Sequence, residues 1–254
     1  MFDYNSSRNS WQYRLPRIPN EALCSTEMEM RGQSPRSLIS RKLGNEGTVP
    51  SFLAIRPKSW DRKIAIVLAH GTGQGMDSPF MKFFHNEMAR RGFLSVQFNF
   101  EYMEAKRSFP DPQPKMQALY RSVVQEVMQK HHPESIVIGG KSMGGRVASY
   151  IAANTPDVSG LAFLGYPLHP PGKPDQRRDA HLFEIQLPML FLSGTADPFA
   201  ERALLEQVAN KLGSRATLIW TEKGDHSLKV GKQGDVPLIA AAEAMERWMR
   251  EKFS

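Results

Sequence analysis

The sequence predicts an α/β fold in which a mostly parallel central sheet is flanked by helices on both faces. Two observations carry this prediction. From Val49 to the end of the 254-residue chain, short apolar runs alternate with amphipathic stretches at helical spacing. The short runs are rich in β-branched residues and apolar on both faces, which is typical of parallel strands covered by helices on both sides.

The expected strands are placed by their apolar runs and by the turn residues between them. They cover Ser51–Ile55, Ile64–Ala69, Phe93–Phe98, Ser135–Ile138, Val158–Leu164, Met189–Ser193 and Ala216–Trp220. In sheets of this kind ligands bind outside the carboxyl ends of the strands, so we expect the functional residues just after these runs.

The expected helices fill the intervals between the strands. The first begins at Asp77-Ser78-Pro79, where an N-cap side chain precedes a proline at the first helical position, and it ends at Gly92. The others are expected at Lys115–Lys130, Ser142–Ala153, Ala200–Leu212 and Pro237–Phe253. Two proline-rich stretches, Glu101–Pro114 and Tyr166–Pro188, are too long for simple connections. They are candidates for the walls or lid of a site, with plain solvated loops as the alternative.

Residues 1–47 differ from the rest of the chain. They are rich in Ser, Asn, Arg and Pro and show no sustained periodicity. We therefore expect a loosely ordered N-terminal extension, followed by one α/β domain over residues 48–254.

The composition argues against several classes of protein. The net charge is +7, but the basic residues are interleaved with acidic ones, so we expect no nucleic-acid partner. No apolar run approaches the roughly 20 residues that cross a bilayer, and the N-terminal residues lack the apolar stretch of a secretory signal. We expect a cytoplasmic protein without a membrane partner. The lone cysteine, Cys24, forms no intrachain disulfide.

The pentapeptide around Ser142, Gly140-Lys141-Ser142-Met143-Gly144, matches the pattern G-x-S-x-G. It lies between an expected strand and an expected helix, which is the context of a nucleophile elbow. There the serine occupies a strained turn, and the small residues around it prevent clashes. This context predicts the α/β-hydrolase fold, with Ser142 as the nucleophile.

Two nucleotide-binding patterns resemble parts of this sequence but fail. A phosphate-binding loop ending in Gly140-Lys141-Ser142 needs a glycine at position 135, which is Ser135. A dinucleotide fingerprint starting at Gly71 needs a glycine at position 76, which is Met76. In a serine hydrolase the glycine-rich loop from His70 instead supplies a backbone N–H to the oxyanion hole. We assign the two donors to Thr72 and Met143, with Gly71 as the alternative to Thr72.

The acid and the base are expected after later strands, in the chain order serine, acid, histidine. Asp197 follows Met189–Ser193 and His226 follows Ala216–Trp220, so both belong at the same sheet edge as Ser142. Asp225 competes for the acid's place, but it is adjacent to His226 and its side chain should point away. The triad is therefore predicted to be Ser142, Asp197 and His226.

Further residues near these motifs are candidates for the substrate pocket: His70, Gly71, Lys141, Tyr166 and His169. His70 has a second interpretation, as a structural histidine that shapes its loop by hydrogen bonding. Basic residues at the elbow and in the long loops would favour an anionic substrate, unless they simply face solvent. These are Lys106, Arg107, Lys141, Arg146, Arg177 and Arg178. The histidines show no metal-ligand spacing, so no metal and no cofactor are expected.

Five segments in order resemble a known family. They are His70–Phe80 (HGTGQGMDSPF), Gly139–Arg146 (GGKSMGGR), Leu164–Pro174 (LGYPLHPPGKP), Gly194–Phe199 (GTADPF) and Gly224–Lys229 (GDHSLK). The likeness, over about Val49 to Phe253, is to a family of predicted α/β-hydrolases common in bacteria. That family is related to testis-expressed protein thirty and to the hydrolase-like domain of a nonspecific-lethal chromatin complex subunit. The resemblance implies the same fold and triad, and it implies no particular substrate.

The expected function is hydrolysis of an ester, thioester or amide through an acyl-enzyme, with a small acyl compound as substrate. The alternative is a non-catalytic α/β-hydrolase-like module that binds a ligand or a protein, because the fold alone does not require catalysis. The complete triad favours the enzyme, since a binding module has no need of nucleophile, acid and base together.

Overall fold

The computed structural model of the chain describes residues 2–5, 10–13, 51–60 and 63–253. The chain divides into two compact units, residues 1–34 and residues 35–254. In the first unit, strands β1 (Phe2–Asn5) and β2 (Ser10–Tyr13) pair in antiparallel register. The rest of the predicted N-terminal extension lies outside the described residues.

The second unit is built on a seven-stranded sheet with the order β3-β5-β4-β6-β7-β8-β9. Its strands are β3 (Phe52–Ile55), β4 (Ile64–Ala69), β5 (Leu94–Phe98), β6 (Ser135–Lys141), β7 (Val158–Leu164), β8 (Met189–Gly194) and β9 (Ala216–Thr221). All neighbours are parallel except β3, which runs antiparallel to β5 at one edge. The predicted fold class, a mostly parallel sheet, is confirmed.

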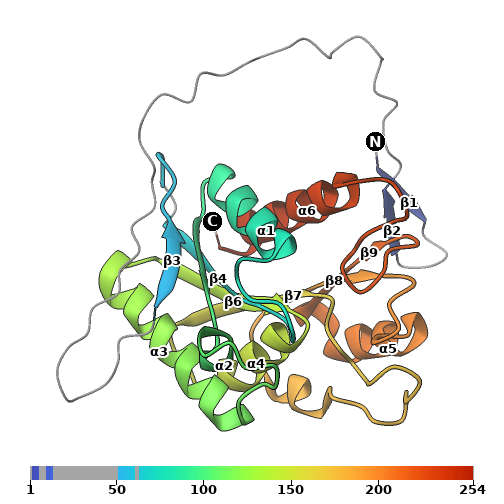
Figure 1. The fold of residues 1–254 in the computed structure, drawn as a ribbon. Coiled ribbons are helices and arrows are strands. Elements are labelled where there is room, and N and C mark those ends of the chain that lie inside the picture. The colour runs from blue at the N-terminus through green and yellow to red at the C-terminus, as the bar shows by residue number, and fades with distance from the viewer. Residues whose placement is uncertain (1, 6–9, 14–50, 61–62, 254) are drawn as a thin grey trace. The chain divides into compact units, whose positions relative to one another are not determined.

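Helices cover both faces of this sheet, as Figure 1 shows. Helices α1 (Pro79–Arg90) and α6 (Val236–Phe253) lie on one face, and α3 (Gln113–His131), α4 (Met143–Ala152) and α5 (Arg202–Leu212) lie on the other. The strands divide their side chains accordingly. In β4, residues 65, 67 and 69 join the core under α3 and α4, while residues 64, 66 and 68 join the core under α1 and α6. This alternation is the period of two that a pleated strand imposes.

The two long proline-rich stretches are more ordered than simple loops. The first contains the one-turn helix α2 (Glu101–Glu104), and the second contains the 3₁₀ helix η1 (Ala180–Glu184). A second 3₁₀ turn, η2 (Gly213–Arg215), leads from α5 into β9. The segment with η1 is fastened to α4, because Ser149 Oγ and His181 Nε2 lie 2.8 Å apart and the His181 ring stacks on Tyr150.

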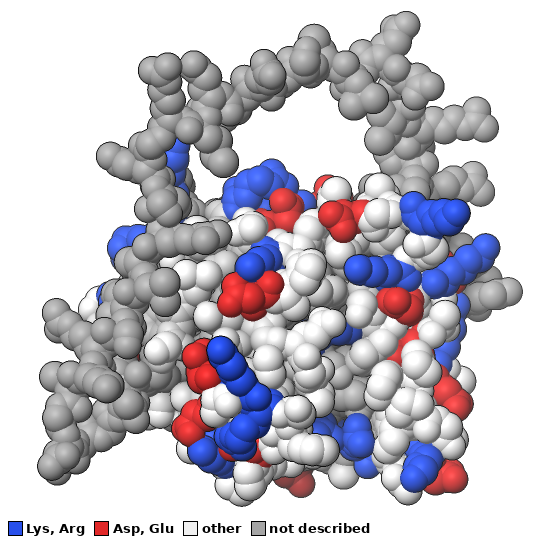
Figure 2. Space-filling model, viewed as in Figure 1, with Lys and Arg blue, Asp and Glu red and all other residues white. Residues whose placement is uncertain are grey.

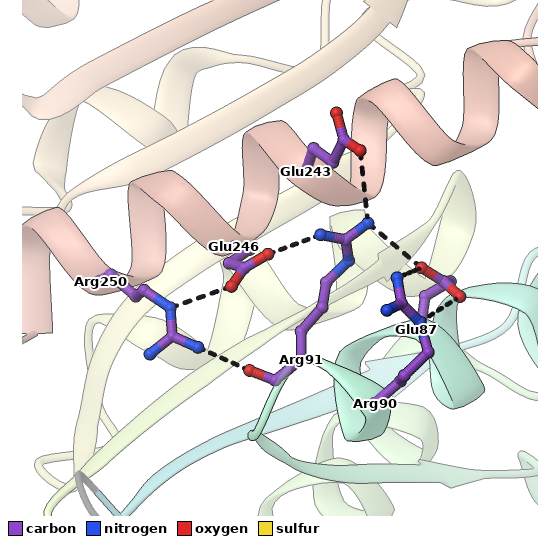
Figure 3. Close-up of polar contacts among 6 residues, drawn as sticks. All are labelled: Glu87, Arg90, Arg91, Glu243, Glu246 and Arg250. Atoms are coloured by element: carbon purple, nitrogen blue, oxygen red, sulfur yellow. Dashed lines mark hydrogen bonds and ion pairs between the residues drawn. The ribbon is translucent and has the colours of Figure 1, made fainter. Parts of the chain in front are cut away.

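The covering helices α1 and α6 are joined by a buried arginine (Figure 3). Arg91, at the end of α1, is only 9% exposed and lies 2.5 Å from Glu246 and 3.8 Å from Glu243, both on α6. Its other partner is Glu87 on α1, at 3.2 Å. Arg250 on α6 completes the cluster by donating to the main-chain oxygen of Arg91 at 2.6 Å.

Lys and Arg side chains are interspersed with Asp and Glu on the face of the molecule that Figure 2 shows. Within the described part of the chain, no helix is both long enough and apolar enough to cross a bilayer.

Candidate active site

Ser142 occupies the sharp turn between β6 and α4. Its backbone has φ 50° and ψ −115°, a conformation that costs a residue with a Cβ of order 1–3 kcal/mol. The turn is held from the neighbouring strand, because the Ser142 N–H donates to the Leu164 main-chain oxygen at 3.1 Å. The strain places the serine side chain at the carboxyl edge of the sheet, ahead of the first turn of α4.

The glycines of the elbow are required by close backbone contacts. A Cβ on Gly140 would lie 2.1 Å from the Ala69 main-chain oxygen, and one on Gly144 would lie 2.3 Å from the same atom. Gly140 also has φ 149°, which L side chains rarely adopt. The elbow therefore packs directly on the end of β4, where a larger residue would push the two segments apart.

The strand before Ser142 also argues against a phosphate-binding loop at this position. β6 continues through Gly139 and Gly140 to Lys141, and these residues pair with β7. A phosphate-binding loop needs free backbone N–H groups in an open loop before its lysine. A paired strand occupies that place here.

Asp197 and His226 meet at the same edge of the sheet. Asp197 follows β8, its side chain is fully buried, and its Oδ2 lies 2.8 Å from His226 Nδ1. Its second oxygen, Oδ1, accepts a hydrogen bond from the Phe199 N–H at 2.8 Å. The Phe199 ring covers the imidazole, with the ring centroids 4.3 Å apart. The carboxylate and the aromatic ring together fix the plane of the histidine.

The competing carboxylate, Asp225, binds backbone N–H groups of its own turn and does not bind the imidazole of His226. It is exposed, and its Oδ1 accepts hydrogen bonds from the backbone N–H groups of Ser227 at 2.7 Å and Lys229 at 2.9 Å. Asp225 thus closes the turn that carries His226. The carboxylate that accepts the hydrogen bond from the imidazole is that of Asp197.

The remaining ring nitrogen of His226, Nε2, is buried and has no hydrogen-bond partner among the described residues. When Nδ1 carries the proton and donates it to Asp197, Nε2 has a free lone pair. That tautomer suits a base that accepts a proton from a hydroxyl group.

The loop after β4 lies against the elbow. A Cβ on Gly71 would come within 3.4 Å of Ser142 Cβ, and Thr72 Oγ1 donates to Met143 Sδ at 3.3 Å. Met143 begins α4, so its backbone N–H has no partner within the helix. The structure therefore brings the side chains of Thr72 and Met143 into contact next to Ser142.

Three of the predicted pocket residues use their polar atoms on main-chain groups. His70 is buried, with Nδ1 2.8 Å from the Gly71 oxygen and Nε2 accepting from the Phe100 N–H. Burial lowers the pKa of His70, opposed by the Gly71 hydrogen bond and by the charge of Glu104. These contacts match the structural interpretation of His70.

His169 and Tyr166 hold the loops next to the acid. His169 Nδ1 lies 2.9 Å from the Pro170 oxygen, and its Nε2 accepts from the Glu201 N–H at 3.1 Å, just beyond Asp197. The Tyr166 hydroxyl donates to the Arg178 oxygen at 2.6 Å, and burial raises the pKa of this phenol. No sequence pattern indicated the contacts with Arg178 and Glu201, because they join residues 12 and 32 positions apart.

Lys141 is also largely enclosed. Its Nζ donates to the main-chain oxygen of His226 and lies 5.0 Å from the centre of the Phe80 ring. Burial lowers the pKa of this ammonium to about 8, against the attraction of Asp197 and Asp225. The sequence predicted Lys141 as a residue of the substrate pocket, whereas its ammonium is bound to the main chain of the protein itself.

A parallel sheet with a serine elbow at its carboxyl edge defines the α/β-hydrolase class. Residues 62–251 match the family described as alpha/beta hydrolase domain, and the chain belongs to that family.

Solved structures show the same fold. An alpha-beta serine hydrolase homologue from Coxiella burnetii is similar with a TM-score of 0.66 and 18% identity, over 84% of this chain and 96% of that one. A dienelactone hydrolase from Anabaena variabilis has a TM-score of 0.68 and 19% identity, over 86% and 98%. The esterase domain of a Rhodothermus marinus protein has a TM-score of 0.66 and 11% identity, over 86% and 99%.

Proposed function

We propose that this protein is a serine hydrolase that cleaves an ester, thioester or amide, with Ser142 as nucleophile, His226 as base and Asp197 as its partner. One observation carries the proposal above the others. The His226 imidazole is bound to the buried carboxylate of Asp197 through Nδ1 at 2.8 Å, while its Nε2 stays unpartnered among the described residues. A base in this state, at the same sheet edge as a strained elbow serine, is prepared to take up a proton.

In the proposed reaction, Ser142 Oγ attacks the substrate carbonyl carbon while its proton passes to His226 Nε2. The carbonyl π electrons move to oxygen, and the N–H groups of Met143 and Thr72 stabilise that oxyanion. Collapse of the tetrahedral intermediate breaks the bond to the leaving group, which takes the proton from His226. Water then attacks the acyl-enzyme with the same histidine as base, releasing the acid and restoring Ser142.

The other predicted site residues take supporting parts in this proposal. Gly71 gives the substrate carbonyl close access to the nucleophile, because a side chain there would crowd Ser142 Cβ. His70, Tyr166 and His169 hold the loops that shape the site. The finer resemblance, to the hydrolases related to testis-expressed protein thirty, agrees with this arrangement and belongs to the same proposal.

The predicted preference for an anionic substrate is weakened because two of its six cations, Arg107 and Arg177, are paired with carboxylates. Arg107 lies 2.7 Å from Asp111, and Arg177 lies 2.5 Å from Asp179. Lys141 is bound to a main-chain oxygen. Paired groups contribute little net field to a ligand, so we propose an acyl substrate without assigning its charge.

The test is covalent labelling with a fluorophosphonate probe, together with turnover of p-nitrophenyl acetate. The wild-type protein should label and hydrolyse the ester, and Ser142→Ala should lose both while keeping its melting temperature. The Ser122→Ala variant is a matched control, because Ser122 is an exposed serine on α3 whose hydroxyl donates to its own helix. A folded wild-type protein with neither labelling nor turnover would favour the non-catalytic binding module.

A further inference from the structure

Lys141 directly precedes the proposed nucleophile, yet its charged end lies beside the proposed base. The arm passes between loops from three strands. Its Cγ lies 3.3 Å from the place of a Cβ on Gly71, and its Nζ lies 3.2 Å from the place of a Cβ on Gly165. The Nζ then reaches the His226 carbonyl, with the Phe80 ring of α1 beneath it. The passage exists because positions 71 and 165 carry no side chain.

The charged groups around this ammonium come from the loops after β8 and β9. They are the carboxylates of Asp197 and Asp225, together with the titratable imidazole of His226 itself. Helix α1 contributes the face of Phe80, and the loops after β4 and β7 contribute the glycines. A lysine that served only solubility would extend its ammonium into water. This one is desolvated and hydrogen-bonded.

The contact completes a two-point hold on the histidine. Asp197 fixes the imidazole through Nδ1, and Lys141 fixes the main-chain oxygen of the same residue. Because Lys141 and Ser142 are neighbours in the chain, the arm links the backbone of the nucleophile to the backbone of the base. One side chain thus spans the 85 positions that separate Lys141 from His226 in the sequence.

We propose that Lys141 is a positioning residue, whose ammonium ties the His226 backbone to the elbow and so keeps the imidazole aligned for proton transfer from Ser142. This inference rests on the proposed serine-hydrolase function. Proton transfer needs heavy-atom distances near 3 Å, and a misplacement of about 1 Å costs on the order of 100-fold in rate.

The pH dependence follows from the state of this ammonium. Below about pH 8 it is charged and is a strong donor to the carbonyl; above that pH it becomes a weaker neutral donor. The wild-type kcat should therefore fall as the pH rises through about 8.

The free energy of unfolding should instead rise over the same pH range. The unfolded chain binds this proton more tightly, so the contribution of Lys141 to stability rises between about pH 8 and its ordinary value of 10.5.

The experiment compares Lys141→Met with Lys229→Met in the full chain, using p-nitrophenyl acetate and the fluorophosphonate probe. Methionine keeps an unbranched apolar arm but cannot donate to the carbonyl. Lys229 is exposed on the same loop as His226, so its variant makes the same change of charge without touching the arm. We expect K141M to lose about 10- to 100-fold in kcat with KM within twofold, and K229M to stay within twofold in both.

Two further readouts separate positioning from general damage. The downfield proton resonance of the His226–Asp197 hydrogen bond should shift in K141M and stay in place in K229M. The fall of kcat above pH 8 should be present in the wild type and absent in K141M. A wild-type kcat that stays level from pH 7 to 9.5 contradicts the proposal, even if K141M does not fold. So does a folded K141M with wild-type kcat. A wild type that fails to label at Ser142 removes the proposed function itself.

Discussion

At the scale of single residues, Asp197 is the most constrained group of the site. Both of its oxygens are engaged, one by the imidazole and one by the backbone N–H of Phe199. The second bond fixes which oxygen faces His226. It also fixes what an amide would do at this position, because only its oxygen can accept from Phe199.

Replacing Asp197 with Asn should reverse the tautomer of His226. With the amide oxygen held by Phe199, the NH₂ group faces Nδ1, so the ring proton moves to Nε2, where it blocks proton transfer from Ser142. We expect kcat/KM for p-nitrophenyl acetate to fall by about 10³- to 10⁴-fold with little change in melting temperature. Asp225→Asn is the matched control, since its remaining oxygen still caps the turn, and its activity should stay within about threefold. Equal losses in the two variants would contradict the assignment of Asp197.

The sequence allowed Ser142, Asp197 and His226 to be proposed as a triad, but not the contacts that hold them. Ser142, Asp197 and His226 each follow an apolar run, and chain order alone distinguishes their parts. The hold of Lys141 on the His226 carbonyl depends on where a strand end meets a loop 85 residues later. The clamp of His169 on the Glu201 N–H depends in the same way on tertiary packing. No local pattern encodes such pairings.

At the scale of elements, the site depends on how closely α4 and β4 approach. Gly144 marks the closest contact within the first turn of α4. A side chain there would meet the Ala69 oxygen at 2.3 Å and the His70 oxygen at 2.7 Å. Both are main-chain atoms at the end of β4 or just after it, so neither moves aside without disturbing the loop that carries Thr72.

Gly144→Ala should therefore lower both stability and activity. We expect a loss of about 1–3 kcal/mol in the free energy of unfolding, measured by urea denaturation, together with a lower kcat because the loop that carries Thr72 is displaced. The control is Gly234→Ala, in a turn before α6 with no atom near the new methyl group. Its positive φ should cost about 1 kcal/mol and leave kcat unchanged. A Gly144→Ala protein with wild-type stability and kcat would show that the approach is not required.

Element boundaries were predictable where the apolar pattern is strong and less so where glycines intervene. Strands Ile64–Ala69 and Val158–Leu164 have the predicted bounds. β6 runs on to Lys141, beyond the predicted end at Ile138, because neighbouring strands pair with Gly139 and Gly140 despite their poor strand propensity. The short helices α2 and η1 were missed, since four or five residues are too few to show a helical period.

At the scale of the whole domain, the sheet separates two cores that are held by different means. Apolar side chains form one core under α3, α4 and α5. On the other face, α1 and α6 are also joined by Arg91 and its glutamates (Figure 3). Burial disfavours the charged form of Glu246, but hydrogen bonds from Arg91 and Arg250 outweigh it and lower the pKa of this carboxyl.

Arg91→Met should destabilise the domain without changing the chemistry of the site. Removing Arg91 takes a largely buried cation away from Glu87 and Glu246, which are themselves partly exposed and keep Arg90 and Arg250 as partners. We expect a loss of about 1–2 kcal/mol in the free energy of unfolding at pH 7. Arg90→Met, at a neighbouring exposed arginine, should cost less than about 1 kcal/mol. In the wild type the stabilisation from the Arg91–Glu246 pair is present above pH 4.5 and is lost as the pH falls toward the lowered pKa of Glu246. The difference in free energy of unfolding between the wild type and Arg91→Met should therefore become smaller in acid. A constant gap from pH 7 to pH 3 would contradict the electrostatic explanation.

The position of β9 has a consequence for how the site fails. β9 is the outermost parallel strand and its residues are only half-buried, whereas all six residues of β4 are buried. Local opening costs least where few apolar contacts are lost. The loop with His226 leaves this edge, while Ser142 leaves the buried centre of the sheet. Fraying of this edge would therefore displace His226, the proposed base, and leave Ser142 in place, so we expect the proposed activity to be lost while most of the domain is still folded.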